Sequence, residues 1–349
     1  MPAVASAGSD RQLPSPDDER DHDVADATPI RFGAFAPQGW KTELIDIPDP
    51  QDKWTVCRDT AVLAEGLGYD SIWVYDHFHN VPAPAHETVF ECWTVMAALA
   101  EATTTIRLGQ MVSCTPYRPP TLTAKITATI DVISGGRLDW GVGAGWYDHE
   151  FKAYGYGFPE AKVRIGMLRE AVEIVRAMWT EPDTSYEGRY YTVAGAQCDP
   201  KPVQDPHPPI WIGGGGEQIT LRVVARHADK ANFGGKPEEW AHKRDVLFGH
   251  CKDVGRDPGE IELTWSPEVC VRDSEDEIRA LVDAGKASRW GEPYDSWKGG
   301  NLVGTPEQVC EKVRAYNDLG CTYFVPWCSD YPDDTTLRVF ADQVMPEFR

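Results

Sequence analysis

The chain has 349 residues and a formal net charge of −21, and no run approaches the ~20 apolar residues that would span a membrane. This acidic balance argues against nucleic acid and anionic membranes as partners, because both demand basic protein surface. With 42% hydrophobic and 26% charged residues, the composition is that of a globular protein, long enough for one large α/β barrel or two ordinary domains.

The N-terminal segment differs in composition from the rest of the chain. Residues 1–28 are rich in acidic side chains and carry almost no large apolar ones, so we expect a disordered acidic tail there and a single domain over 29–349. The tail lacks the apolar core of a secretory signal, and the nine cysteines are scattered without a CxxC pair. Both features favour a cytoplasmic protein with reduced thiols in its core.

Short runs that are apolar on both faces recur along the chain, as in the strands of a buried parallel sheet. In chain order they span 30–35, 71–75, 106–111, 138–142, 210–212, 230–233, 261–266 and 322–326. Helical patterns lie between them, over 53–67, 90–100, 122–133, 163–179, 218–227, 238–254, 274–287 and 306–319. The last helix opens with a cap residue, a proline and an early acid, Thr305-Pro306-Glu307.

This alternation of eight strands with eight helices predicts an α/β fold, the (β/α)₈ TIM barrel. A plain barrel needs only ~250 residues, so we expect insertions, which we place at 77–89, 147–160, 181–208 and 289–304. The last of these is either a lid or a surface loop with buried aromatic anchors. A doubly wound open sheet is the alternative fold, but the turn after the first strand, 34–38, lacks its glycine-rich fingerprint.

Chemistry in such a barrel collects at the C-terminal ends of the strands. The second strand is followed by Asp76 and His77, a carboxylate and an imidazole that are suited to proton transfer or to orienting a ring. His77, His79 and His86 share one loop, but their spacing matches no metal motif, and we predict no metal site. The structural alternative is that Asp76 caps the loop and His77 fills space.

The third strand runs into Val112, Ser113 and Cys114. Small hydroxyl and thiol side chains let a flat ligand approach the backbone closely, so we assign Ser113 and Cys114 to cofactor binding. Cys114 is also a candidate nucleophile, although the sequence assigns no base to it.

The fourth strand ends in Gly143-Ala144-Gly145-Trp146-Tyr147. The first three residues have little or no side chain, and the next two carry aromatic rings. This pattern favours one wall of a ring-binding pocket. The alternative is that the glycines serve only a tight turn.

The fifth strand leads into four glycines, Gly213, Gly214, Gly215 and Gly216, directly before a predicted helix. Glycine-rich backbone that feeds a helix N-terminus binds anions and suits phosphate. A simple turn would not need all four glycines, so we predict a phosphate site.

These stretches together resemble the luciferase-like monooxygenase superfamily, most closely the branch that depends on the deazaflavin coenzyme F-420. The matching segments are 30–38, 69–78, 91–120, 126–151, 188–229, 232–240 and 301–313. The resemblance implies a barrel with the cofactor ring over its C-terminal mouth. It further implies a bulge near Val112 and Ser113, often with a non-prolyl cis peptide, under the ring. The glycine run then matches the phosphate loop, and Asp76 and His77 match the pair at the ring edge.

The resemblance also implies the chemistry, which is hydride transfer between F-420 and a small organic substrate, with His77 or Tyr147 as the proton partner. Sugar-phosphate dehydrogenases of the superfamily carry a glutamate after the strand-four glycines, where this chain has Trp146. That departure weighs against sugar-phosphate oxidation and leaves the general acid unidentified.

Two other functions stay open at this point. With reduced FMN, the same barrel mouth would perform monooxygenation and would need a flavin reductase as partner. A non-catalytic cofactor-binding barrel is the third interpretation. The superfamily allows for a homodimer, and Lys201, Arg222 and Lys236 are candidate partners for the anionic F-420 tail.

Overall fold

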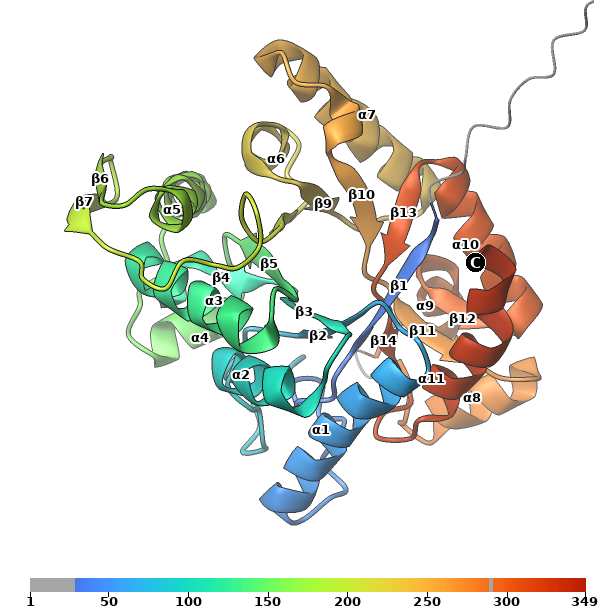
Figure 1. Cartoon of the computed structure of the whole chain (residues 1–349). Helices are drawn as coiled ribbons and strands as arrows, with labels where there is room; N and C mark the ends of the chain where they lie inside the picture. Colours follow the sequence, from blue (N-terminus) through green and yellow to red (C-terminus); the bar gives the residue numbers. More distant parts are fainter. Residues whose placement is uncertain (1–28, 289–290) are drawn as a thin grey trace, which may run out of the picture.

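Eight parallel strands close into a barrel in the computed structural model, which describes residues 29–288 and 291–349 (Figure 1). Around the ring these are β1 (Arg31–Phe35), β2 (Ser71–Val74), β3 (Arg107–Gln110), β5 (Leu138–Gly143), β8 (Ile210–Gly213), β9 (Lys230–Asn232), β10 (Glu262–Trp265) and β13 (Cys321–Phe324). Because β3 pairs with β5 and β13 pairs with β1, the ring has no free edge. The predicted TIM barrel is therefore confirmed, whereas the predicted tail over 1–28 lies outside the described residues.

Helices cover the outside of the ring (Figure 1), and each of the eight predicted helices overlaps a helix of the structure, although Ile278 of the predicted helix 274–287 belongs to a separate buried cluster with Cys270, Trp297 and Val303. The overlapping helices are α1 (Pro50–Gly66), α2 (Cys92–Ala102), α3 (Pro120–Ser134), α5 (Ala161–Thr180), α6 (Thr220–His227), α7 (Pro237–Val254), α8 (Glu275–Asp283) and α10 (Pro306–Asp318). As the sequence predicts, Thr305 caps α10, in a capping box with Gln308.

The predicted insertions carry elements of their own. Helix α4 (Asp148–Ala153) follows β5, and β6 (Thr184–Glu187) pairs with β7 (Thr192–Ala196) in an antiparallel hairpin. A second parallel sheet consists of β11 (Glu268–Val271), β12 (Leu302–Gly304) and β14 (Trp327–Cys328), of which β12 alone falls within a predicted insertion. Helices α9 (Tyr294–Gly300) and α11 (Thr335–Val339) complete this region. Trp297 of α9 is buried and donates a hydrogen bond to Glu268 at 2.7 Å, which anchors that segment.

Aromatic rings fill the barrel interior. The rings of Trp73 and Trp211 lie 4.5 Å apart, and those of Trp211 and Tyr323 lie 5.0 Å apart. A Cβ atom on Gly109 would lie 2.3 Å from the Trp73 ring, so this glycine makes room for the indole. The nine cysteines are all buried and free, as the sequence predicts. The interior is thus a packed core.

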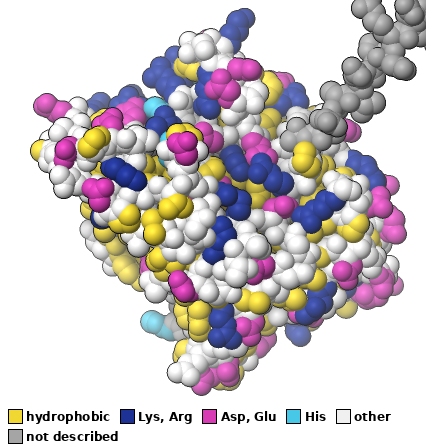
Figure 2. Space-filling view, in the orientation of Figure 1, with side chains coloured by type: hydrophobic (Ala, Val, Ile, Leu, Met, Phe, Trp, Pro, Cys, Tyr) yellow, Lys and Arg dark blue, Asp and Glu magenta, His cyan; other side chains and the backbone are white. Residues whose placement is uncertain are grey.

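Ion pairs occupy the other end of the barrel, where the strands begin. Arg31 pairs with Glu262, Arg107 with Asp139 at 2.7 Å, and Lys230 with Glu262 at 3.3 Å. Figure 2 shows Lys and Arg side chains near the middle of one face, with acidic side chains scattered among and around them. Within the described ranges, no helix is long and apolar enough to cross a membrane.

Glu65, at the end of α1, forms hydrogen bonds with the turn before β3. Its Oε1 accepts hydrogen bonds from the backbone amides of Thr104, Thr105 and Ile106 at 2.8, 2.5 and 3.0 Å. Partial burial alone would raise the pKa of Glu65, but these bonds outweigh burial and lower it to about 2.

We therefore expect E65Q to flatten the dependence of stability on pH. The folded-state pKa lies below the unfolded value, so the carboxylate stabilises the fold above roughly pH 4.3 and loses this effect as the pH falls toward the folded value. At neutral pH E65Q should lower the free energy of unfolding by about 1 kcal/mol, because solvent screens the interactions of this partly exposed group. Urea unfolding from acid to neutral pH measures it, with the exposed Glu101 as the matched E101Q control. Parallel curves for E65Q and wild type would contradict the assignment.

Candidate active site

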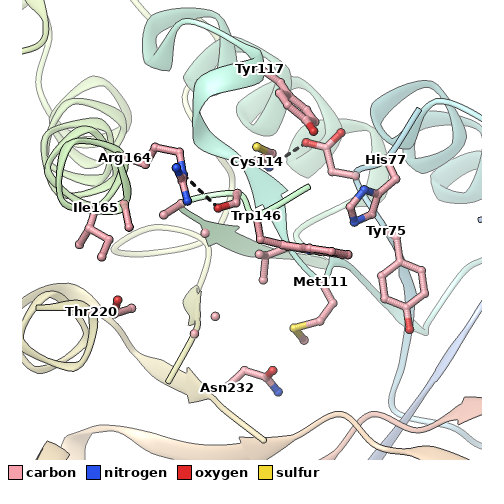
Figure 3. Close-up of a pocket in the computed structure, with 18 of the residues that line it drawn as sticks. Tyr75, His77, Met111, Cys114, Tyr117, Trp146, Arg164, Ile165, Thr220 and Asn232 are labelled. Atoms are coloured by element: carbon pink, nitrogen blue, oxygen red, sulfur yellow. Dashed lines mark hydrogen bonds between the residues drawn. The ribbon is translucent and has the colours of Figure 1, made fainter. Parts of the chain in front are cut away.

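A cavity of about 390 Å³ opens at the C-terminal ends of the strands (Figure 3). Its size falls within the ~300–1,000 Å³ typical of small-molecule sites. Ten predicted site residues line it: Asp76, His77, Val112, Cys114, Gly143, Ala144, Gly145, Trp146, Gly213 and Gly214. Other elements add residues that the predicted site does not include, namely Trp40, Tyr75, Met111, Tyr117, Ala161, Arg164, Ile165, Thr220 and Asn232.

Four predicted residues do not line this cavity. Ser113 lies in a separate small pocket between the barrel and its helices. The Tyr147 hydroxyl donates to the backbone carbonyl of Asn80 at 3.0 Å, so that its proton is engaged at the rim. Gly215 and Gly216 continue the loop beyond the lining. Their roles in binding and catalysis stay predictions.

The bulge that the resemblance implies after the third strand is present. From Gly109 to Ser113 the chain advances four residues, while its partner β5 advances three, from Asp139 to Val142. The extra residue falls at the cis peptide between Met111 and Val112, just before the short strand β4 (Ser113–Cys114).

Val112 projects from this bulge into the floor of the cavity. Cβ atoms on Gly143 and Gly213 would lie 2.5 and 2.8 Å from its methyl groups. These two glycines are therefore required by packing around Val112, whether or not a ligand approaches them. The result is an apolar floor between the ends of β5 and β8.

Asp76 holds β4 in place. Its carboxylate accepts the amide of Cys114 at 2.8 Å and both guanidinium nitrogens of Arg118, at 2.7 and 3.0 Å. Arg118 also binds Glu91 at 2.7 Å. Asp76 thus lines the cavity while both its oxygens are engaged within the protein. Burial raises the pKa of Cys114, so its thiol is poorly suited to act as a nucleophile.

His77 belongs to a buried polar cluster with Glu150 and Tyr117. Its Nδ1 lies 2.8 Å from Oε2 of Glu150, which also accepts the Tyr117 hydroxyl at 2.6 Å. Burial alone would raise the pKa of Glu150, but its hydrogen bonds, that with His77 foremost, keep the pKa below its ordinary value. Within the described ranges, no group of His, Cys, Asp and Glu could hold a metal ion.

Aromatic rings fix the plane of the His77 imidazole. Trp40 stacks on it with a centroid distance of 4.4 Å and an interplanar angle of 5°, and Trp146 meets it edge-on at 5.8 Å. Trp146 is 55% exposed, so an indole lies at the cavity mouth. Figure 3 shows His77 and Arg164 reaching the cavity from different elements.

The glycine loop after β8 forms the opposite end of the cavity. Gly214 has φ +130°, a conformation that favours glycine, and its amide donates to the carbonyl of Asn232 at 2.9 Å. Lys243 lies beside Gly215, since a Cβ atom there would be 3.2 Å from Nζ. Of the cations predicted from the sequence, Lys201 instead binds backbone carbonyls, and none of the three lines the cavity.

Arg164 of α5 is a buried cation at the same end. Its guanidinium donates to the carbonyl oxygens of Gly145, at 3.3 Å, and Pro159, and it lies 4.0 Å from the centroid of the Phe158 ring. In the part of the chain that the structure describes, no carboxylate lies within 4.0 Å of it. Because a buried charge is costly unless it is paired, the cavity suits an anionic ligand group here.

Sequence reasoning missed the residues that organise the two ends of this cavity. Glu150 has one available signal, because it is an acid four residues after Trp146 and an apolar residue follows it. Tyr117 and Arg164 have none, because only the folded chain brings them to the cavity.

A closed parallel barrel with a lined cavity at its C-terminal mouth has the architecture of a TIM-barrel enzyme. Residues 30–296 match the family model of luciferase-like monooxygenases, and the chain belongs to this family. The resemblance that the sequence motifs carry is thereby confirmed.

Relatives in this family use two cofactors. The chain is 36% identical over 323 residues to an F-420-dependent glucose-6-phosphate dehydrogenase of Amycolatopsis mediterranei, covering 83% of this chain and 93% of the relative. It is 25% identical over 356 residues to an FMNH₂-dependent dimethylsulfone monooxygenase of Pseudomonas putida, covering 92% and 96%. An F-420-dependent secondary alcohol dehydrogenase, solved with an F-420–acetone adduct, matches with a TM-score of 0.77 at 21% identity, covering 92% and 99%. At that identity the likeness shows the fold alone.

Proposed function

We propose that this enzyme transfers a hydride between coenzyme F-420 and a small organic substrate. The observation that carries the proposal is one cavity that has a glycine loop and a cation at one end and an imidazole at the other, the cation having no carboxylate partner among the described residues. The 36%-identical relative that is F-420-dependent supports the choice of cofactor.

The residues present fit such a cofactor. Arg164, Lys243 and the amides of Gly215 and Gly216 offer positive charge and donors for phosphate. Val112 gives an apolar floor for a flat ring, and the cavity mouth is bordered by Trp40 and Trp146. When bound, a deazaflavin would supply a hydride donor or acceptor, while the protein supplies orientation and excludes water.

His77 would handle the proton that accompanies the hydride. Its Nδ1 is engaged with Glu150, and its Nε2 makes no hydrogen bond to the described residues, so Nε2 is free for substrate. Trp146 stands where the sugar-phosphate dehydrogenases of this superfamily carry a glutamate. We infer that the substrate is a small molecule with an apolar or aromatic part, rather than a sugar phosphate.

The second candidate is a monooxygenase that uses reduced FMN from a flavin reductase. The 25%-identical FMNH₂-dependent relative favours it, because it spans nearly the whole chain. Both cofactors present a flat ring and a phosphate to the same cavity.

Equilibrium binding of F-420 and FMN, each oxidised and reduced, separates the two candidates. We expect F-420 to bind purified protein tightly and FMN weakly, as measured by fluorescence and calorimetry. The reverse order would make the enzyme an oxygen-using flavoprotein. Failure of both to bind would leave a non-catalytic barrel and would end the proposal.

A further inference from the structure

We propose that Glu150 is a positioning residue that decides which nitrogen of His77 carries a proton. The proposal rests on the proposed role of His77 in hydride transfer. It concerns a residue of α4, outside the barrel strands, that does not itself line the cavity.

Four donors converge on the Glu150 carboxylate. Oε1 accepts the backbone amides of Phe78 and His79 at 2.7 and 2.9 Å. Oε2 accepts the Tyr117 hydroxyl at 2.6 Å and faces Nδ1 of His77 at 2.8 Å. The side chain is 0% exposed, and the two amides can only donate. A proton on this carboxyl group would displace one of these donors, so the group is held as an anion.

An anionic Glu150 dictates the state of the imidazole. A carboxylate can only accept, so Nδ1 of His77 must carry a hydrogen, and neutral His77 keeps its lone pair on Nε2. The stacking of Trp40 on the ring holds it in the plane that this bond requires. When Nε2 takes up a proton, the carboxylate 2.8 Å from Nδ1 stabilises the resulting imidazolium.

The same arrangement serves both directions of the reaction. In alcohol oxidation, Nε2 of His77 would take up the hydroxyl proton, and a bound oxidised cofactor would supply the hydride acceptor. In reduction, Nε2 would return that proton to the substrate, and a bound reduced cofactor would supply the hydride. Glu150 takes no proton in either direction.

Other titratable groups also surround His77, and each bears on a pH profile. From the elements packed around it, these groups are Asp76 with Arg118, Cys114, Tyr117, Tyr147, His79 and Glu150 itself. Asp76 is neutralised by Arg118, and burial raises the pKa of Cys114 and of Tyr147 above their ordinary values. Glu150 is therefore the charged group in direct contact with the imidazole.

The variant E150Q tests the proposal, because glutamine has the shape of glutamate but carries an NH₂ donor in place of one of the two carboxylate oxygens. The amides of Phe78 and His79 cannot reorient, so the glutamine oxygen should face them and its NH₂ group should face His77. Nδ1 must then accept, which moves the imidazole hydrogen to Nε2. In Y117F the carboxylate stays intact, so the original tautomer should persist.

Nitrogen-15 NMR of histidine-labelled protein without cofactor reads the tautomer directly. We expect Nδ1–H His77 in wild type, Y117F and the D148N control, and Nε2–H in E150Q. In turnover with F-420, E150Q should lower kcat by roughly 10²–10⁴-fold and change its pH profile, with little change in cofactor affinity. D148N alters a carboxylate of the same helix that is 45% exposed and pairs with Lys152, and it should match wild type.

An Nε2–H tautomer in wild type, or an unchanged tautomer in E150Q, would overturn the proposal. If E150Q does not fold, the wild-type and Y117F spectra still decide the tautomer. Because these spectra need no cofactor, they are independent of the proposed function, which fails separately if F-420 does not bind.

Discussion

The variant H77N should lower kcat by about 10²–10⁴-fold while F-420 binds almost as tightly as to wild type. Asparagine retains a short polar group that can donate to Glu150, but it places no titratable nitrogen where Nε2 lies. The loss should therefore fall on proton transfer and spare the anion-binding end of the cavity, where Arg164 and the glycine loop lie. Single-turnover hydride transfer, followed by cofactor absorbance, measures the step directly.

His79 provides the matched control for this experiment. It lies two residues further along the same loop, and its ring packs 4.9 Å from that of His149 without lining the cavity. H79N should therefore retain most of the activity. A wild-type rate in H77N would remove His77 from the mechanism, and an equal loss in both variants would point to damage to the loop itself.

The barrel itself was predictable because its signals are local and repeated. Each barrel strand is a short apolar run, since both of its faces are buried, and each connecting helix has its own apolar period. The elements that the sequence did not reveal are short or lie at the edges. Strands β4 and β14 have two residues each, which is too few for a period to appear. The segment 322–326 was predicted as one strand, but the chain ends β13 at Phe324 and resumes pairing in β14.

The site was predictable where it depends on chain position and unpredictable where it depends on packing. Loops at strand ends must meet at the barrel mouth, so Asp76, His77 and the glycine runs could be placed there from order alone. The hydrogen-bond partners of these side chains could not be predicted from order alone. Asp76 binds Arg118 and the amide of Cys114, whereas Glu150 binds His77. Those choices depend on contacts between residues that are 38 to 73 positions apart in the chain.

The variant R164M should weaken F-420 binding about 10–100-fold, because a hydrogen bond to a charged group contributes roughly 1.5–3 kcal/mol. Methionine keeps much of the apolar stem of arginine beside Phe158 while it removes the buried charge. Calorimetric titration measures the loss, which should shrink at high salt because screening weakens the wild-type interaction. R169M is the matched control, since Arg169 lies on the same helix, is 43% exposed and pairs with Glu170.

A phosphate-free deazaflavin separates two explanations for the same loss. If Arg164 binds the cofactor phosphate, R164M should bind the phosphate-free compound as wild type does. If Arg164 only ties the loops through the carbonyls of Gly145 and Pro159, both compounds should lose affinity equally, and the anion assignment would be wrong. We expect the first result, because carbonyl contacts orient a guanidinium but leave its buried charge uncompensated.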